Sequence, residues 1–245
     1  MKVSIITVCY NSEKTIEDTI KSIAAQTYKN IEYIIIDGGS KDTTNDIVNK
    51  YKDIVSIHLS EPDNGLYDAM NKGIKLATGD LVGVLNSDDV LYDNNVIENI
   101  VLNIGDYDGI YADVGFYEQD LGKKTRHYSS DNFVKEKFSR GFMPAHPSFY
   151  VRNEHYKTVG DYNLNYKIAA DFDIVLRLFN LPNVKFKYLN QEVVKMRIGG
   201  VSTSGISSNI TLNKEILESC RNNNVPCSWL SILSKYPEKI IGLLK

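Results

Sequence analysis

The sequence has few of the residues that build disulfide frameworks and zinc sites. Its 245 residues include three cysteines and four histidines, and no two cysteines form a Cys-x-x-Cys pair. An odd and widely spaced set of cysteines does not indicate a disulfide framework, and a zinc site would need clustered cysteines and histidines. We therefore expect a protein of the reducing cytoplasm.

Long apolar runs and an excess of positive charge are also missing. No uninterrupted apolar segment is long enough to span a bilayer, and the first residues turn polar too early for a signal peptide. The formal net charge of −3 gives no basic footprint for nucleic acid. With 42% hydrophobic and 24% charged residues, the composition is that of a folded protein able to bury a sizeable core.

What the sequence does have is an alternation of two periods in its first half. β-branched apolar runs at residues 3–9, 31–36, 54–59 and 81–85 predict buried strands. Between them, apolar residues recur at helical spacing in the segments 16–24, 43–50 and 66–77. Strands that alternate with helices predict an α/β fold with a mostly parallel sheet and right-handed crossovers.

The pattern changes after about residue 105. Strands are predicted at 107–117, 126–128, 184–189 and 193–198, and helices at 171–179 and 208–221. We interpret residues 1–205 as one domain with a nucleotide-binding half (1–105) and an acceptor half (106–205), followed by a helical extension (206–245). The apolar residues and lysines of 225–245 fit either a terminal helix docked on the core or an interfacial segment, which would place the protein peripherally at the inner face of the membrane.

Three predicted strands end in polar residues suited to a nucleotide diphosphate. Ligands of open parallel sheets bind beyond the carboxyl ends of the strands. Each turn alone is ordinary turn or cap chemistry, because Asn, Asp, Ser and Gly are favoured there, but the three together predict a site. The segments are Thr7 to Asn11, Asp37 to Ser40 and Asn86 to Asp89.

Asp88 and Asp89 follow a buried strand directly. Two adjacent carboxylates repel each other, and a turn does not require both. A hard divalent cation would relieve the repulsion and bridge to phosphate oxygens. Ligation by oxygen alone favours Mg²⁺ or Mn²⁺, which would act as a Lewis acid on the departing diphosphate. The alternative is that one of the two acids caps the helix expected near Asn94.

The order of several short motifs is specific, although each alone is weak. They are Thr7-Val8-Cys9-Tyr10-Asn11, Asp37-Gly38-Gly39-Ser40, Gly65 to Gly73, Thr78-Gly79-Asp80, Asn86-Ser87-Asp88-Asp89 and Ala170-Asp171-Phe172-Asp173. In this order they resemble family 2 glycosyltransferases, enzymes of the GT-A fold that act in bacterial polysaccharide assembly. The resemblance covers about residues 1–200. It implies a Rossmann-like sheet with flanking helices and a smaller acceptor-side region. It also implies an inverting, metal-dependent transfer from a nucleotide-sugar, with UDP favoured, to a glycan or lipid-linked glycan.

The resemblance implies roles for matching residues in the donor site. Thr7 and Tyr10 would line the nucleobase and ribose pocket, with Tyr10 offering a stacking face. Asp37 would accept a hydrogen bond from the N–H of the base. Asp88 would contact ribose or metal, and Asp89 would be the principal metal ligand.

The helix that contains Met70 departs from the family pattern, because many relatives carry arginine there. Diphosphate or sugar contacts would then fall to Asp68, Asn71 or Lys72. Many relatives also have a histidine ligand near residue 200, and this sequence has none there. The metal would then depend on Asp89, phosphate oxygens and water.

An inverting transfer needs a general base that takes the proton of the acceptor hydroxyl. Asp171 is the candidate, because it lines up with apolar residues of its helix and would point inward. Asp173 lies on another face, four residues before Arg177, as expected for an i,i+4 ion pair. The resemblance also assigns the base to Asp171, although Ala170 stands where relatives carry Glu. The alternative is that Asp171 only adds charge to the first helical turn.

His146 and Arg197 are further candidates for the acceptor or diphosphate pocket. His146 lies in a rigid turn, where a single histidine is more often structural than catalytic. Arg197 precedes the glycine pair 199–200, which could close over the diphosphate while the guanidinium forms charge-assisted bonds. The alternative is an ordinary glycine loop.

The sequence fits three other functions less well. A sugar nucleotidyltransferase would need a Gly-rich basic loop after Val8, and a glycosidase does not explain three strand-end contacts. A catalytically inactive nucleotide-sugar binder is the non-enzymatic alternative. The combination of Asp37, Asp89 and Asp171 favours the enzyme, because a binder has no need of a base.

Overall fold

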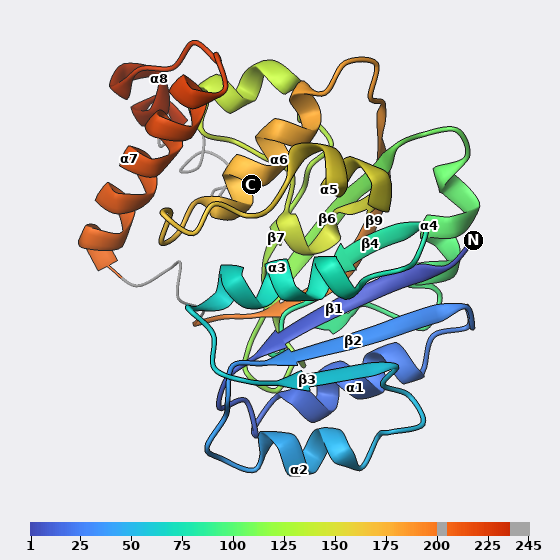
Figure 1. The fold of residues 1–245 in the computed structure, drawn as a ribbon. Helices are drawn as coiled ribbons and strands as arrows, with labels where there is room; N and C mark the ends of the chain where they lie inside the picture. The colour runs from blue at the N-terminus through green and yellow to red at the C-terminus, as the bar shows by residue number, and fades with distance from the viewer. Residues whose placement is uncertain (200–204, 236–245) are drawn as a thin grey trace.

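A nine-stranded sheet forms the centre of the protein, which a computed structural model describes over residues 1–199 and 205–235 (Figure 1). The strands are β1 (Val3–Cys9), β2 (Ile31–Asp37), β3 (Ile57–Ser60), β4 (Leu81–Val84), β5 (Val90–Leu91), β6 (Gly109–Tyr117), β7 (Lys124–Tyr128), β8 (Tyr150–Arg152) and β9 (Phe186–Arg197). Their order is β3-β2-β1-β4-β8-β6-β9-β5, and β7 pairs with β6. Strands of both predicted halves therefore belong to one sheet.

The first half has the predicted parallel arrangement. β1 pairs in parallel with β2 and β4, and β2 pairs in parallel with β3. All seven residues of β1 are buried, as expected for a strand covered on both faces. The intervening helices are α1 (Ile16–Ala24), α2 (Thr44–Asn49), α3 (Leu66–Leu76) and α4 (Val96–Ile104).

The second half adds mostly antiparallel pairings. β8 is antiparallel to β4 and β6, β7 to β6, and β5 to β9, whereas β6 and β9 are parallel. β9 is one twelve-residue strand where two short strands were predicted, and register shifts opposite residues 112–114 accommodate the polar break. The helical elements of the second half are η1 (Lys135–Arg140), η2 (His146–Ser148), α5 (Asn153–Val159), α6 (Ala170–Asn180), α7 (Gly205–Asn222) and α8 (Trp229–Leu233).

Helices cover both faces of the sheet (Figure 1). Alternate residues of β1 divide between two apolar clusters, because successive side chains of a strand point to opposite faces. Val3 and Ile5 pack with residues of α1 and α4, whereas Ile6 and Val8 pack with residues of α3, α6 and α7. Each fully buried aliphatic side chain stabilises the fold by about 1.5–3 kcal/mol.

The carboxyl-terminal elements pack on the core as far as the structure describes them. Ser228 caps α8 with a capping box, and Ile232 is fully buried. Trp229, Leu230 and Leu233 of the same helix are exposed. Residues 236–245, which belong to the predicted interfacial segment, lie outside the described residues. Within the described part of the chain, no helix is both long and apolar enough to cross a bilayer.

Candidate active site

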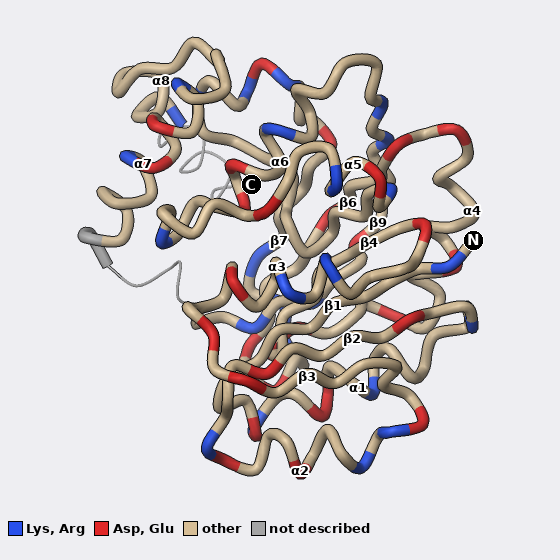
Figure 2. Tube along the Cα trace, in the orientation of Figure 1, with Lys and Arg blue, Asp and Glu red and all other residues tan. Residues whose placement is uncertain are grey.

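The turns that follow β1, β2 and β4 meet at one edge of the sheet, as the sequence predicted. The Ser12 and Ser87 hydroxyls lie 2.9 Å apart and join the first turn to the third. The backbone N–H of Asn11 donates to Ser40 Oγ, and the Asn11 side-chain oxygen accepts from the N–H of Lys41, both at 2.8 Å. Acidic residues gather at this edge (Figure 2).

Asp89 is buried with few hydrogen-bond donors. Its side chain is 2% exposed, and Asn86 Nδ2 donates to it over a long 3.4 Å. Burial, followed by the charge of Asp88, raises the pKa of Asp89 well above its usual range, although a backbone bond from Arg197 opposes the shift. The Asn86 side-chain oxygen is buried and has no partner. This donor set fits a hard divalent cation, which would compensate the carboxylate charge and satisfy the amide oxygen.

Asp37 is also buried, but its carboxylate is saturated with donors. Ser60 Oγ (2.6 Å), Asn45 Nδ2 (2.9 Å) and the N–H of Ser40 (3.0 Å) donate to one oxygen, and the Ser40 hydroxyl donates to the other. Burial alone would raise the pKa of Asp37, but these bonds outweigh burial and hold it below its usual value. In this conformation the carboxylate holds the turn together.

Two predicted donor contacts are not available in this conformation. Thr7 is fully buried on the face covered by α1, and its hydroxyl accepts from Tyr33. Asn71 is 4% exposed, and its amide bonds both the N–H and the C=O of Tyr162, at 2.7 and 3.0 Å. In this conformation each side chain joins elements of the core, and the donor-site roles of Thr7 and Asn71 stay predictions.

Other predicted donor residues lie nearer the surface. Tyr10 is 61% exposed, so its ring is free to stack. Asp88 is partly buried at the turn itself. Asp68, in the first turn of α3, accepts from the N–H of Asn64 at 2.9 Å, and Lys72 pairs with Glu61 at 2.9 Å. The structure brings Tyr10 and Asp88 to the edge where the three turns meet.

Arg197 ends β9 and binds the turn that carries Asp88. Its guanidinium donates to the carbonyl of Asp88 (2.6 Å), to Asp18 Oδ2 of α1 (2.6 Å) and to the carbonyl of Gln119 (2.9 Å). The side chain is 7% exposed. In this conformation the guanidinium is bonded to the protein, and its contact with diphosphate stays a prediction. Residues 200–202 of the predicted lid lie outside the described residues.

His146 is buried in η2 and contacts Tyr162. Its Nε2 lies 2.6 Å from the Tyr162 hydroxyl, and burial lowers the pKa of His146 to about 4. A neutral, buried ring of this kind does not line an open phosphate pocket. The interpretation of His146 as structural is therefore the one that fits its surroundings.

Asp171 lies in the first turn of α6 and is partly buried. Burial, and to a smaller extent the nearby charge of Glu215, raise the pKa of Asp171 to about 6. The predicted ion pair of Asp173 with Arg177 is confirmed at 2.8 Å. Asp173 nevertheless has the more buried side chain, at 4% exposure, because Ser219 of α7 also donates to it (2.7 Å). Asp173 therefore contacts α7 as well as Arg177 of its own helix.

Sequence reasoning missed two groups at this site. The side-chain oxygen of Asn86 was not predicted as a metal ligand. Glu215 was not considered, because nothing in its local sequence connects position 215 with position 171. Within the described residues, no group of three or more His, Cys, Asp or Glu side chains forms a ready metal site.

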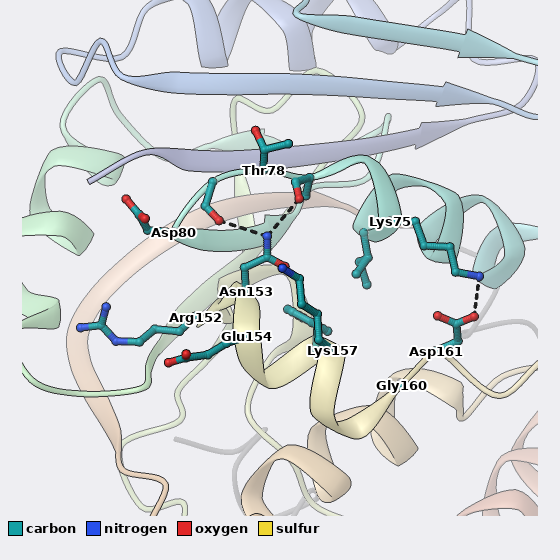
Figure 3. Close-up of a pocket in the computed structure, with 13 residues that line it drawn as sticks. Lys75, Thr78, Asp80, Arg152, Asn153, Glu154, Lys157, Gly160 and Asp161 are labelled. Carbon is teal, nitrogen blue, oxygen red and sulfur yellow. Dashed lines mark hydrogen bonds and ion pairs between the residues drawn. The ribbon is translucent and has the colours of Figure 1, made fainter.

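A separate cavity of about 850 Å³ lies at the opposite edge, between the end of α3 and α5 (Figure 3). Several of its polar groups are already bonded within the protein. Lys75 pairs with Asp161 (2.6 Å), and Asn153 binds the carbonyls of Ala77 and Gly79. Thr78 in the same wall donates to Glu32 (2.6 Å). We assign neither donor nor acceptor to this cavity, since the strand-end turns are at the other edge.

Comparison with known proteins identifies the family. Residues 4–166 match the family model for glycosyl transferase family 2. The chain belongs to glycosyltransferase family 2. It is 31% identical over 222 residues to a PGL/p-HBAD biosynthesis glycosyltransferase of Mycobacterium bovis, covering 88% of this chain and 82% of the relative. An uncharacterized glycosyltransferase of Mycobacterium tuberculosis is 35% identical over 178 residues, covering 71% and 68%.

Solved structures of glycosyltransferases share the fold. The S. aureus TarS 1–349 structure in complex with UDP-GlcNAc has a TM-score of 0.73 at 20% identity, over 91% of this chain and 67% of TarS 1–349. Against another TarS 1–349 structure the chain spans 66% of that protein. The mannosyltransferase of Pyrobaculum calidifontis in complex with GDP-Man and Mn²⁺ has a TM-score of 0.64 at 14% identity, over 99% and 80%. This glycosyltransferase therefore has the predicted GT-A fold.

Proposed function

We propose that this glycosyltransferase is metal-dependent and inverting, and that it transfers a sugar from a UDP-sugar to a glycan or lipid-linked glycan in bacterial surface polysaccharide synthesis. One observation carries the proposal. The carboxylate of Asp89 is buried and poorly bonded, and the side-chain oxygen of the nearby Asn86 is buried without a partner. The Mn²⁺ in the Pyrobaculum calidifontis complex and the UDP-GlcNAc in the TarS complex support it.

Asp89 and the Asn86 side-chain oxygen would hold the cation, with Asp88 beside them. Bound Mn²⁺ or Mg²⁺ would supply Lewis-acid stabilisation of the negative charge on the departing diphosphate. Tyr10 would offer its exposed ring to the base. The buried Asp37 would shape the turn under the donor, and a direct bond from the base would need one of its present partners to move.

Asp171 would take the proton of the acceptor hydroxyl as that oxygen attacks the anomeric carbon. A base works best when its pKa lies near the working pH, and a pKa of about 6 leaves Asp171 mostly ionised at neutral pH while keeping it a better proton acceptor than an exposed aspartate. Activity should therefore fall as the pH drops through about 6, since protonation of Asp171 removes the base.

Two variants test the catalytic role. In Asp171→Asn, UDP binding in the presence of Mn²⁺ should be unchanged, whereas turnover should fall by about 10²–10⁴-fold, the usual contribution of a general base. Asp173→Asn on the same helix is the control, and its turnover measured well below its melting temperature should stay closer to that of the unmodified enzyme. Normal turnover in Asp171→Asn would rule out the base assignment.

The donor is identified by a thermal-shift panel of UDP- and GDP-sugars with Mn²⁺. A ligand that binds the folded protein raises its melting temperature by mass action. The preferred donor should then be hydrolysed by the purified enzyme, and EDTA should stop the hydrolysis. Turnover that persists in EDTA would exclude the role of the cation.

We also propose a cytoplasmic location with peripheral contact at the membrane. The free thiols of Cys9, Cys220 and Cys227 support a reducing compartment. The exposed side chains of Trp229, Leu230 and Leu233 support the membrane contact. Flotation with anionic vesicles should be weakened by Leu230→Ser if the contact exists.

A further inference from the structure

A carboxylate from the carboxyl-terminal helix α7 lies at the start of the helix that carries Asp171. Glu215 is 8% exposed, and its two oxygens accept hydrogen bonds from the backbone N–H groups of Lys167, Ile168 and Ala169, each at 2.9 Å. These three residues immediately precede α6. Glu215 is therefore the acceptor for the backbone that leads into the first turn of α6.

A buried carboxylate is costly unless its charge is compensated. Successive backbone N–H groups form a concave donor set that binds an anion, and the amino end of a helix favours negative charge. Ala169, the residue before α6, has no side chain that could cap the helix. Glu215 supplies from 46 residues away the acceptor that the local sequence lacks.

The same segment is held from its other side by α3. The Tyr67 hydroxyl donates to the carbonyl of Ile168 at 2.6 Å, and the Tyr67 ring stacks on Tyr162 with ring centroids 5.7 Å apart. Ile168 thus has its N–H bound by α7 and its C=O bound by α3. A backbone segment fixed at both groups restricts the orientation of the helix that follows it.

We propose that Glu215 is a positioning residue for Asp171, and that α7 is thereby part of the catalytic centre and not a separate extension. The inference rests on the proposed role of Asp171 as the base. It extends that role by naming the group, distant in the sequence, that holds the base in place.

The charge of Glu215 has a second effect on Asp171. The titratable neighbours of Asp171 are the hydroxyls of Tyr67 and Tyr162 and the carboxylate of Glu215, with His146 behind Tyr162. After burial, Glu215 is the group that raises the pKa of Asp171. Removing this negative charge should lower the pKa of Asp171 and move the acid limb of activity to lower pH.

The test compares Glu215→Gln with Glu218→Gln. Glu218 is exposed on the same helix, and its replacement makes the same change of charge, whereas the N–H groups of 167–169 donate to Glu215. Hydrogen exchange of the amides of Lys167, Ile168 and Ala169 should become at least about tenfold faster in Glu215→Gln and stay unchanged in Glu218→Gln. This readout needs neither donor nor acceptor.

Turnover gives the second readout, with the UDP-sugar that the thermal-shift panel selects. In Glu215→Gln the kcat should fall about tenfold, because a charge-assisted bond is lost, while the KM for the donor and the Kd for UDP with Mn²⁺ stay within about twofold. The acid limb should move to lower pH. A parallel loss of UDP binding and kcat, or a pH profile and exchange rates like those of Glu218→Gln, would overturn the proposal.

Failure of the base assignment is seen separately. If Asp171→Asn keeps normal turnover, the proposed base is wrong, whatever the amide exchange shows. If Asp171→Asn loses turnover but Glu215→Gln behaves like Glu218→Gln, the base stands and the role of Glu215 does not. Tyr67→Phe, which removes only the hydroxyl that binds Ile168, should also lower kcat. It should shift the acid limb of the pH–activity profile less than Glu215→Gln does.

Discussion

The turns after β2 and β4 each bury an aspartate at the same edge of the sheet, but the two carboxylates are bonded differently. Asp37 accepts hydrogen bonds from Ser40, Asn45 and Ser60, and its pKa is lowered in spite of burial. Asp89 has a long bond from the Asn86 side chain and a backbone bond from Arg197, and its pKa is nevertheless raised. Equal burial therefore does not mean an equal role.

The two carboxylates differ in the source of the groups that compensate their negative charge. The carboxylate of Asp37 receives its donors from within the protein, from Ser40 of the turn, Asn45 of α2 and Ser60 of β3, and is saturated without a ligand. The turn after β4 leaves both a carboxylate and the amide oxygen of Asn86 with unmet bonding capacity, which a cation would meet. A carboxylate that the protein leaves underbonded is the better candidate for a ligand site than one that the protein saturates.

Among variants of the two turns, the largest expected effect is the loss of activity in Asp89→Asn. Removing the principal ligand removes the Lewis-acid contribution of several kcal/mol, so turnover should fall by about 10²–10³-fold. The stability should change in the opposite direction. In EDTA the variant should melt at a higher temperature than the unmodified enzyme, because an underbonded buried charge is gone. Mn²⁺ should raise the melting temperature of the unmodified enzyme only.

Turnover equal to that of the unmodified enzyme would contradict the metal role of Asp89. A lower melting temperature in EDTA would instead show that its carboxylate is already compensated within the protein. The two readouts therefore test the ligand role and the bonding difference separately.

Asp37→Asn should reverse this stability result. An amide cannot accept all the bonds that the carboxylate accepts, so the free energy of unfolding should fall by about 2–3 kcal/mol. The stabilisation by Asp37 is present above its unfolded-state pKa and is lost as the pH falls through its lower folded-state pKa. The contribution of Asp89 depends on pH in the opposite way: in EDTA the protein loses stability as the pH rises through the raised pKa of Asp89.

Urea unfolding of both variants in EDTA, from pH 3 upward, measures these dependences. The difference between Asp37→Asn and the unmodified enzyme should shrink toward acid pH. In EDTA, Asp89→Asn should be more stable than the unmodified enzyme, and this gain in the free energy of unfolding should also shrink toward acid pH. If both variants were destabilised alike, the contrast between the two turns would be wrong.

The sequence predicted the sheet of the first half and the meeting of the three turns, because these follow from strand periodicity and parallel pairing. It could not rank Asp37 against Asp89, since the donors to Asp37 include Ser60, which arrives from another strand. The present partners of Asn71 and Arg197 could not be predicted for the same reason: Tyr162 and Asp88 lie 91 and 109 residues away. A motif locates a residue at a site, but the packing of distant segments decides which side chains stay free.

The smallest of the expected effects concerns Arg197. This residue of β9 holds the turn after β4 from outside the turn, which is a further difference from the turn after β2. Its guanidinium fixes the carbonyl of Asp88 and pairs with Asp18. Groups that orient a metal ligand are typically worth 10–100-fold in metal affinity, and Arg197→Ala should weaken Mn²⁺ binding by about tenfold at the lower end of that range. Arg197→Lys should recover only part of the loss, since an ammonium cannot bond three separated acceptors as a fork does.

Mn²⁺ titration followed by the thermal shift measures the affinity, with Arg126→Ala as the control, because Arg126 is exposed and contacts Phe116 instead of the turn. Asp18→Asn should weaken binding in the same direction as Arg197→Ala but less, because the bond to Asp88 remains. Mn²⁺ binding that is unchanged in Arg197→Ala would mean that the turn after β4, like the turn after β2, holds its own shape.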